Sequence, residues 1–382
     1  MSGTHPGFGV YVHWPFCQTI CPYCDFNVHK QSPVDEAVWR QALRSELAHY
    51  AAETAGRTVS SLYFGGGTPS LMAPATVATL IDDVAALWPT APDIEITLET
   101  NPTSSEREQL GDLRAAGINR VSVGVQSLDD EALKFLGRDH SASDALQSLE
   151  RAQAIFPRTT FDLIYARPGQ TLEAWQRELE MALGYAGGHI SLYQLTIEQG
   201  TPFFREGLKP ADEDSAADMF EATQDTLAAA GYAAYEVSNH ARPGDESRHN
   251  LTCWRGGDYL GIGPGAHGRL TLDGKFFGTH QIHNPTRWLD LTGSNGHGTA
   301  KRRLLSTEDR ARELLMMGLR LAEGVDKARL LAITGLSLEQ MINPEARDRL
   351  INGEMLIEDE TRLYATADGR QRLNAVLGSL LN

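Results

Sequence analysis

The chain has 382 residues, of which 41% are hydrophobic and 22% are charged, as in ordinary globular proteins of one or two domains. Its 34 Lys and Arg against 50 Asp and Glu give a formal net charge of −16, which argues against non-specific binding to nucleic acid or anionic membranes. The sequence has no run of 18 apolar residues, no signal-peptide pattern at its start and too few cysteines for a disulfide framework. We therefore expect a cytoplasmic protein without a transmembrane segment.

The first half of the chain alternates short strands with longer helices. The expected strands are 8–13, 59–64, 94–99, 120–125, 160–165 and 189–197. The expected helices are 35–53, 75–88, 105–115, 129–135, 143–155 and 172–183. Six strands separated by helices are typical of parallel βα units, found in doubly wound sheets and in barrels. Polar and Gly-rich residues gather just after the strands, which favours an α/β fold with an incomplete (β/α)6 barrel over residues 1–200.

The pattern changes after residue 200. A helix over 215–230 and a segment at 235–237 precede a Gly-rich stretch, 255–279, that predicts hairpins and loops. We expect residues 201–298 to extend the barrel, with a linker at 292–299. Residues 299–382 predict a small, mostly helical, winged-helix-like domain. Because the chain is acidic and lacks a basic recognition helix, we do not expect this domain to bind nucleic acid.

Three of the four cysteines form one CxxxCxxC motif directly after the first strand: Cys17, Cys21 and Cys24. Three thiolates leave one iron of a [4Fe–4S] cluster free for an outside ligand, whereas a structural zinc site takes four protein ligands. The spacing therefore favours an iron–sulfur cluster with an open iron. A zinc site completed by His13 or His29 stays open as an alternative.

Polar motifs follow the next four strands. Gly-Gly-Gly-Thr-Pro occupies 65–69, Glu-Thr-Asn-Pro 99–102, Gly-Val-Gln-Ser 124–127 and Phe-Asp-Leu-Ile-Tyr 161–165. Glycines let the backbone approach a ligand, and a carboxylate at a strand end can accept hydrogen bonds from an ammonium or a ribose. In a barrel these strand ends meet at one opening, so the motifs predict a single binding site.

In this order, the cysteine triplet and the four motifs resemble the radical S-adenosylmethionine (SAM) superfamily, and more closely its coproporphyrinogen-dehydrogenase-like branch. The resemblance implies that Cys17, Cys21 and Cys24 bind a [4Fe–4S] cluster whose open iron is chelated by SAM. It also implies SAM-binding roles for a set of residues around the opening. These are Tyr11, Gly66 and Glu99 for SAM, Tyr23 near its adenine, and Gly67, Thr68, Gln126, Arg138 and Asp162 around the neighbouring pocket.

Two functions occur in this branch: an oxygen-independent coproporphyrinogen III dehydrogenase of heme biosynthesis, and a heme chaperone that passes heme to apoproteins. Phe26 stands where the dehydrogenase has a fourth cysteine, and only ten residues precede Tyr11, where the dehydrogenase has a long extension. Residues 249–254, His-Asn-Leu-Thr-Cys-Trp, resemble the HNxxYW signature of the chaperones. We therefore expect a chaperone that binds a [4Fe–4S] cluster, SAM and heme. The implied partners are apo-hemoproteins, including membrane respiratory enzymes, and dimer formation and enzymatic activity both stay open.

The same signature contains two candidates for the axial ligand of heme iron. Cys253 replaces its Tyr and is either a small buried substitute or a thiolate ligand of heme iron. His249 is the second candidate, with local hydrogen bonding as the alternative role. Arg167 precedes a Pro-Gly pair where relatives have an apolar residue, and it either binds a heme propionate or forms a salt bridge.

Overall fold

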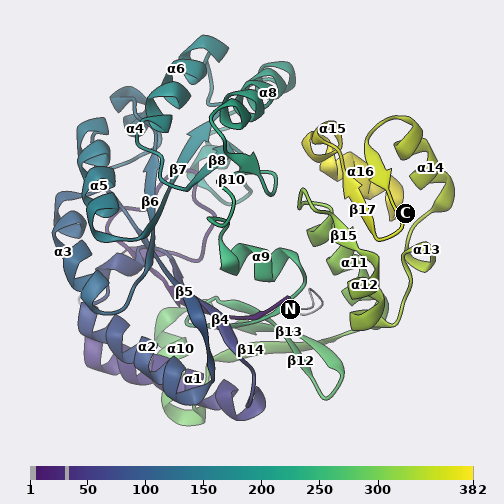
Figure 1. Ribbon diagram of the computed structural model, residues 1–382. Helices are drawn as coiled ribbons and strands as arrows, with labels where there is room; N and C mark the ends of the chain where they lie inside the picture. The colour runs from purple at the N-terminus through teal and green to yellow at the C-terminus, as the bar shows by residue number, and fades with distance from the viewer. Residues whose placement is uncertain (1–5, 31–33, 382) are drawn as a thin grey trace.

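A computed structural model describes residues 6–30 and 34–381. The expectation that the start of the chain carries no signal peptide falls largely on residues 1–5, which lie outside the described residues. Within the described residues the main feature is a twelve-stranded mixed sheet in the order β14-β13-β12-β11-β1-β4-β5-β6-β7-β8-β10-β9. Its centre is six parallel strands in chain order, which curve into an open barrel (Figure 1). They are β1 (Phe8–Trp14), β4 (Val59–Gly66), β5 (Thr90–Thr100), β6 (Arg120–Gln126), β7 (Arg158–Tyr165) and β8 (His189–Gln194). The expected incomplete (β/α)6 barrel is confirmed.

Helices cover the outer face of this barrel (Figure 1). They are α1 (Glu36–Glu53), α2 (Pro74–Leu87), α3 (Ser104–Ala115), α4 (Asp130–Phe135), α5 (Ala142–Ile155) and α6 (Leu172–Leu183). Most begin at a side chain that accepts hydrogen bonds from the first-turn backbone, such as Asp35, Thr103 and Thr171. Apolar residues such as Leu43 and Leu47 of α1 pack on the outward side of the strands in one large core. These caps and apolar faces explain why the helices were predictable.

Beyond residue 200 the sheet grows at both edges. Helix α8 (Glu213–Ala229) leads to β9 (Ala233–Ala234) and β10 (Asn239–Ala241), so the expected segment at 235–237 is a bend between two short strands. On the other edge β11 (Asp258–Ile262) pairs parallel with β1, which was not expected from a stretch predicted to form hairpins. Strands β12 (His267–Leu272) and β13 (Lys275–Gln281) form an antiparallel hairpin, as predicted. Strand β14 (Thr299–Leu305), which the sequence analysis placed in the C-terminal domain, pairs antiparallel with β13 in the large sheet.

The prediction of a linker at 292–299 is wrong. Residues up to 295 complete α10 (Pro285–Asn295), which Gly296 ends with a left-handed C-cap, and β14 begins at Thr299. The linker composition therefore reflects a helix end followed by a strand, and β14 remains hydrogen-bonded to the large sheet.

The C-terminal residues form a separate apolar core around Leu315, Leu330 and Leu363. Helices α11 (Thr307–Gly318), α12 (Lys327–Thr334), α13 (Leu338–Met341), α14 (Pro344–Asn352), α15 (Ala367–Gln371) and α16 (Leu373–Leu380) surround a three-stranded sheet. That sheet is β15 (Val325–Asp326), β17 (Arg362–Ala365) and β16 (Leu356–Glu358). The small, mostly helical domain is confirmed, and it stands beside the barrel in Figure 1. No helix among the described residues is long and apolar enough to span a membrane.

Candidate functional site

The interior of the barrel, which we call the lumen, is bounded by the inner faces of the six parallel strands, and the end at which these strands finish is called the mouth. Five of the six parallel strands, β1 and β4 to β7, carry partly exposed residues there that are flanked by buried neighbours, and β8 carries Tyr193, which is 39% exposed and follows the buried Leu192. Because side chains alternate across a strand, these positions face the interior and their neighbours face the helices. They are Tyr11, Tyr63, Glu99, Gly124, Gln126, Asp162 and Tyr193. Four of the predicted site residues, Tyr11, Glu99, Gln126 and Asp162, therefore line one polar lumen.

The cysteine loop lies at this mouth. It leaves the barrel through β2 (Phe16–Cys17), which pairs parallel with β3 (His29–Lys30) and so closes the loop at its base. All four cysteines are free thiols; Cys17 is buried, whereas Cys21 and Cys24 are partly exposed. Burial raises the pKa of Cys24 to about 11 and also raises that of Cys17. Cys17 and Cys24 therefore stay neutral thiols until a cation such as iron favours their thiolates.

Arg138 connects the cysteine loop to the strand ends. Its Nη1 donates to Cys21 Sγ at 3.2 Å, and its Nη2 donates to Asn101 Oδ1 at 2.6 Å and to the Gly124 carbonyl at 2.9 Å. Asn101 in turn donates to Thr68 Oγ1 at 3.0 Å. The structure therefore brings together two predicted residues, Arg138 and Thr68, through Asn101. Sequence reasoning quoted Asn101 within its motif without giving it a role.

The glycine loop after β4 packs directly on the cysteine loop. A Cβ atom on Gly67 would lie 2.6 Å from the Phe16 carbonyl oxygen and 3.0 Å from Cys17 Sγ. Gly66 has a φ of +113°, which other residues rarely adopt. These glycines are required for the close approach of two loops, and a contact between them and SAM stays a prediction.

Glu99 is held by two donors inside the lumen. Tyr63 Oη donates to its Oε1 at 2.8 Å, and the Gly66 backbone N–H donates to Oε2 at 3.2 Å. Burial raises the pKa of Glu99 to about 7 and that of Asp162 to about 6. An ammonium group placed beside Glu99 would restore its charge. Tyr63 was missed, although the alternation Ser61-Leu-Tyr63 places it on the inner face.

These residues fit the cofactors that the resemblance implies. Three free thiols share one loop, a guanidinium already donates to one of them, and a small cavity lined by Cys21, Asn101 and Arg138 adjoins the loop. In the part of the chain that the structure describes, no three His, Cys, Asp or Glu side chains are arranged around a single metal ion. His13 is also engaged, since its Nδ1 contacts Tyr11 Oη at 3.0 Å and its Nε2 contacts the Asn27 carbonyl at 3.0 Å. The donor set thus suits a cluster with several irons better than one zinc ion.

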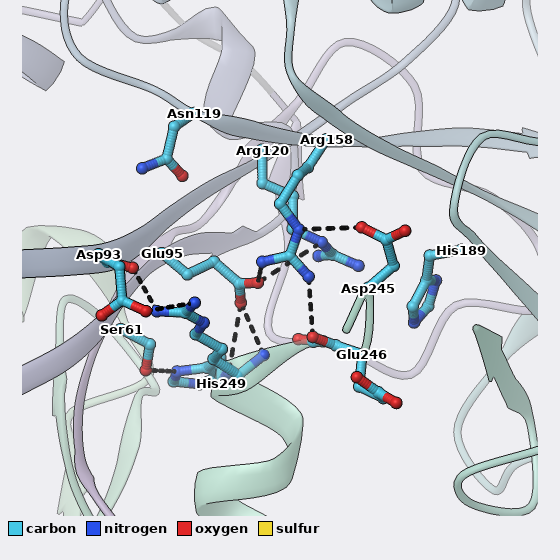
Figure 2. A network of polar contacts seen from close by, with 12 residues as sticks. Ser61, Asp93, Glu95, Asn119, Arg120, Arg158, His189, Asp245, Glu246 and His249 are labelled. Carbon is cyan, nitrogen blue, oxygen red and sulfur yellow. Dashed lines mark hydrogen bonds and ion pairs between the residues drawn. The ribbon is translucent and has the colours of Figure 1, made fainter. Parts of the chain in front are cut away.

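A buried charge network fills the opposite end of the barrel, which we call the floor (Figure 2). Glu95 accepts from Arg158 Nη1 at 2.6 Å and lies 3.8 Å from Arg120 Nε. It also accepts from the backbone N–H groups of Arg248 at 2.9 Å and His249 at 3.3 Å, which begin α9 (Arg248–Trp254). Two arginines and a helix N-terminus thus compensate one buried carboxylate. The network fixes α9 against the floor.

His249 and Cys253 both lie in this floor helix. His249 is buried, its Nδ1 contacts Ser61 Oγ at 3.2 Å, and its ring lies 5.0 Å from that of Tyr63. The pKa of His249 is lowered to about 4 by burial, so the ring is neutral. Cys253 Sγ lies 3.9 Å from His249 Nε2, and burial raises its pKa to about 12. This geometry supports local packing, and heme ligation by either side chain stays a prediction.

Arg167 and Tyr23, two further residues named in the sequence analysis, lie near the ends of β7 and β8. Arg167 is buried and donates to Glu178 Oε2 at 2.8 Å and to the Ile164 carbonyl at 2.6 Å. It therefore forms an internal ion pair that joins the end of β7 to α6. Tyr23 packs on a small apolar cluster that includes Leu136 and lies at the ends of β7 and β8. Its expected place near adenine stays a prediction.

Comparison with known proteins agrees with this geometry. Residues 11–182 match the radical SAM superfamily, and residues 305–372 match the HemN C-terminal domain. The heme chaperone HemW of Escherichia coli is 38% identical over 97% of this chain and 97% of its own length. The mitochondrial radical S-adenosyl methionine domain-containing protein 1 of Bos taurus is 44% identical over 83% of this chain and 74% of its own. The solved structure of E. coli coproporphyrinogen III oxidase, HemN, shares the fold with a TM-score of 0.82, at 23% identity over 99% of this chain and 91% of its own.

The fold and the three-cysteine loop at the barrel mouth define a radical SAM protein with a HemN-type C-terminal domain. Within that superfamily, the chain belongs to the family of the heme chaperone HemW. The radical SAM family implies a [4Fe–4S] cluster and SAM as its cofactors.

Proposed function

We propose that this protein is a heme chaperone that binds heme and passes it to apoproteins. The observation that carries the proposal is full-length similarity to HemW, at 38% identity in E. coli and 34% in Bacillus subtilis, each over 97% of this chain. Phe26 supports it, because this position lies two residues after Cys24 and offers an exposed phenyl ring where the dehydrogenase has a fourth cysteine.

Cys17, Cys21 and Cys24 would hold the cluster, and Glu99 would hold SAM through its amino group. When bound, the cluster supplies the electron with which radical SAM proteins cleave SAM. The chain's own residues contribute position and charge. Arg138 keeps a guanidinium against Cys21 Sγ, so its positive charge lies beside a sulfur that would hold the cluster. Tyr63 and the Gly66 N–H orient the Glu99 carboxyl group in the lumen.

A coproporphyrinogen III dehydrogenase is the second candidate, favoured by the HemN-like fold and by the polar lumen below the cluster loop. One paired assay separates the two functions. Protein with a reconstituted cluster is titrated with heme and, in parallel, incubated with coproporphyrinogen III, SAM and a reductant. We expect stoichiometric heme binding and no protoporphyrinogen. Turnover without stable heme binding would overturn the chaperone proposal.

The receiving apoproteins would include membrane respiratory enzymes, and we place the chaperone in the cytoplasm. Four free cysteines without a disulfide support a reducing compartment. Transfer is tested by mixing the heme-loaded protein with an apo-cytochrome and following the heme spectrum of the acceptor. Sedimentation before and after cluster loading tests a dimer.

A further inference from the structure

Three histidines outside the cysteine loop gather at the rim of the mouth. His267 begins β12, His280 lies near the end of β13, and His283 follows β13. The rings of His267 and His280 stack at 4.1 Å, and those of His280 and His283 meet edge to face at 4.5 Å. His267 and His283 are exposed, with His280 partly exposed between them. We call these three residues the rim triad.

The rim triad adjoins the cysteine loop. Asn27, three residues after Cys24, donates through Nδ2 to the Pro264 carbonyl and to the His283 carbonyl, both at 2.9 Å. These bonds tie the end of the cysteine loop to both ends of the segment that carries the triad. The exposed ring of Phe26 belongs to the same loop. The residue that follows Phe26 thus anchors the segment that carries the three imidazoles.

The arrangement of the triad suits heme iron better than a bare ion. Stacked rings do not direct three nitrogens to one point, and no group of three such ligands surrounds a single ion within the described residues. Heme iron already has four porphyrin nitrogens and needs only one or two axial ligands. His280 Nε2 is buried without a hydrogen-bond partner. Lys301, opposite His280 in the β13–β14 register and exposed, offers a cation for a propionate.

We propose that the rim triad supplies the axial ligand of the heme, through His267 or His283, with His280 holding the two in place. This assignment rests on the proposed heme-chaperone function and identifies where on the chain the heme sits. It places heme beside the cluster loop. His249, by contrast, is enclosed at the floor between Ser61 and the rings of Tyr11 and Tyr63.

The test uses full-length protein with a reconstituted cluster and hemin as the probe. The variant His267→Ala/His280→Ala/His283→Ala is compared with wild type by absorption and electron paramagnetic resonance spectra during titration. The matched control is His49→Ala/His297→Ala, which removes another stacked histidine pair with ring centroids 4.1 Å apart. Iron content and SAM binding verify that each variant is folded, and free imidazole is added back to the triple variant.

We expect roughly tenfold or weaker hemin affinity in the triple variant, with loss of the axial-histidine spectrum and its recovery on adding imidazole. Single variants then identify the ligand. Hemin binding with an unchanged spectrum in the triple variant would overturn the assignment and leave the chaperone function standing. Loss of the spectrum in His249→Ala or Cys253→Ser, but not in the triple variant, would also overturn it. Wild-type protein that binds no hemin would instead refute the proposed function.

Discussion

Replacing Gly67 with Ala tests whether the glycine loop exists to let the cysteine loop approach. The added Cβ would lie 2.6 Å from the Phe16 carbonyl oxygen, about 0.8 Å inside the 3.4 Å at which ordinary contact begins. It would also lie 3.0 Å from Cys17 Sγ. Both neighbours are tightly placed, since the Thr68 N–H donates to the same Phe16 carbonyl at 2.8 Å. The clash must therefore move backbone that carries a cluster ligand.

Overpacking of this kind costs about 1–3 kcal/mol. We expect Gly67→Ala to lower the free energy of unfolding in urea by that amount and to reduce iron and sulfide per chain after reconstitution. Gly111→Ala is the matched control, because its Cβ has nothing within 4 Å and the residue lies in α3. That change should leave cluster content intact and stabilise the chain by about 0.5–1 kcal/mol. A Gly67→Ala protein with unchanged stability and full iron content would refute the reasoning.

Three further changes test the charged and buried groups. Glu95→Gln should cost about 3–5 kcal/mol in urea unfolding because it removes the carboxylate beside the buried Arg120 and leaves Arg158 with Asp245 alone, and a loss below about 1 kcal/mol would contradict this. Glu99 has a pKa raised to about 7, so its carboxylate, which would bind the SAM ammonium, forms as pH increases through 7. SAM affinity measured by calorimetry should therefore rise over this range. A Glu99→Gln protein that keeps this pH dependence would exclude Glu99 as its source. Arg138→Gln should release the cluster faster on exposure to chelator, since Cys21 Sγ loses its donor, and an unchanged release rate would contradict that role.

The sign of the Glu99 effect on stability follows from its raised pKa. The folded protein retains a proton on this carboxyl up to about pH 7, whereas a Glu in the unfolded chain loses it near its ordinary pKa of 4.5. The contribution of Glu99 to the free energy of unfolding is therefore fully present below pH 4.5 and is lost as pH rises toward 7. Glu99→Gln should remove that part of the pH dependence of unfolding.

Local features of the sequence determined the barrel and the cluster loop. The caps at Asp35 and Thr171, the apolar strands and the turn residues between them act over a few residues, so the order of βα units could be predicted. The Cys17, Cys21 and Cys24 spacing is equally local. Their motif and the strand-end motifs also indicated the family that the relatives then confirmed.

Contacts between distant segments were decided only by the tertiary structure. Nothing in residues 258–262 indicates that they pair parallel with β1. The pairing of β11 with β1 depends on the position of a strand that lies 250 residues earlier in the same chain. The same holds for Arg167, for which the sequence left a propionate contact or a salt bridge open, and which forms a buried ion pair with Glu178 of α6. The position of His249 at the floor, away from the rim triad, likewise depends on how α9 docks against Glu95. Sequence patterns locate chemical groups along the chain, whereas long-range packing decides which of them share a site.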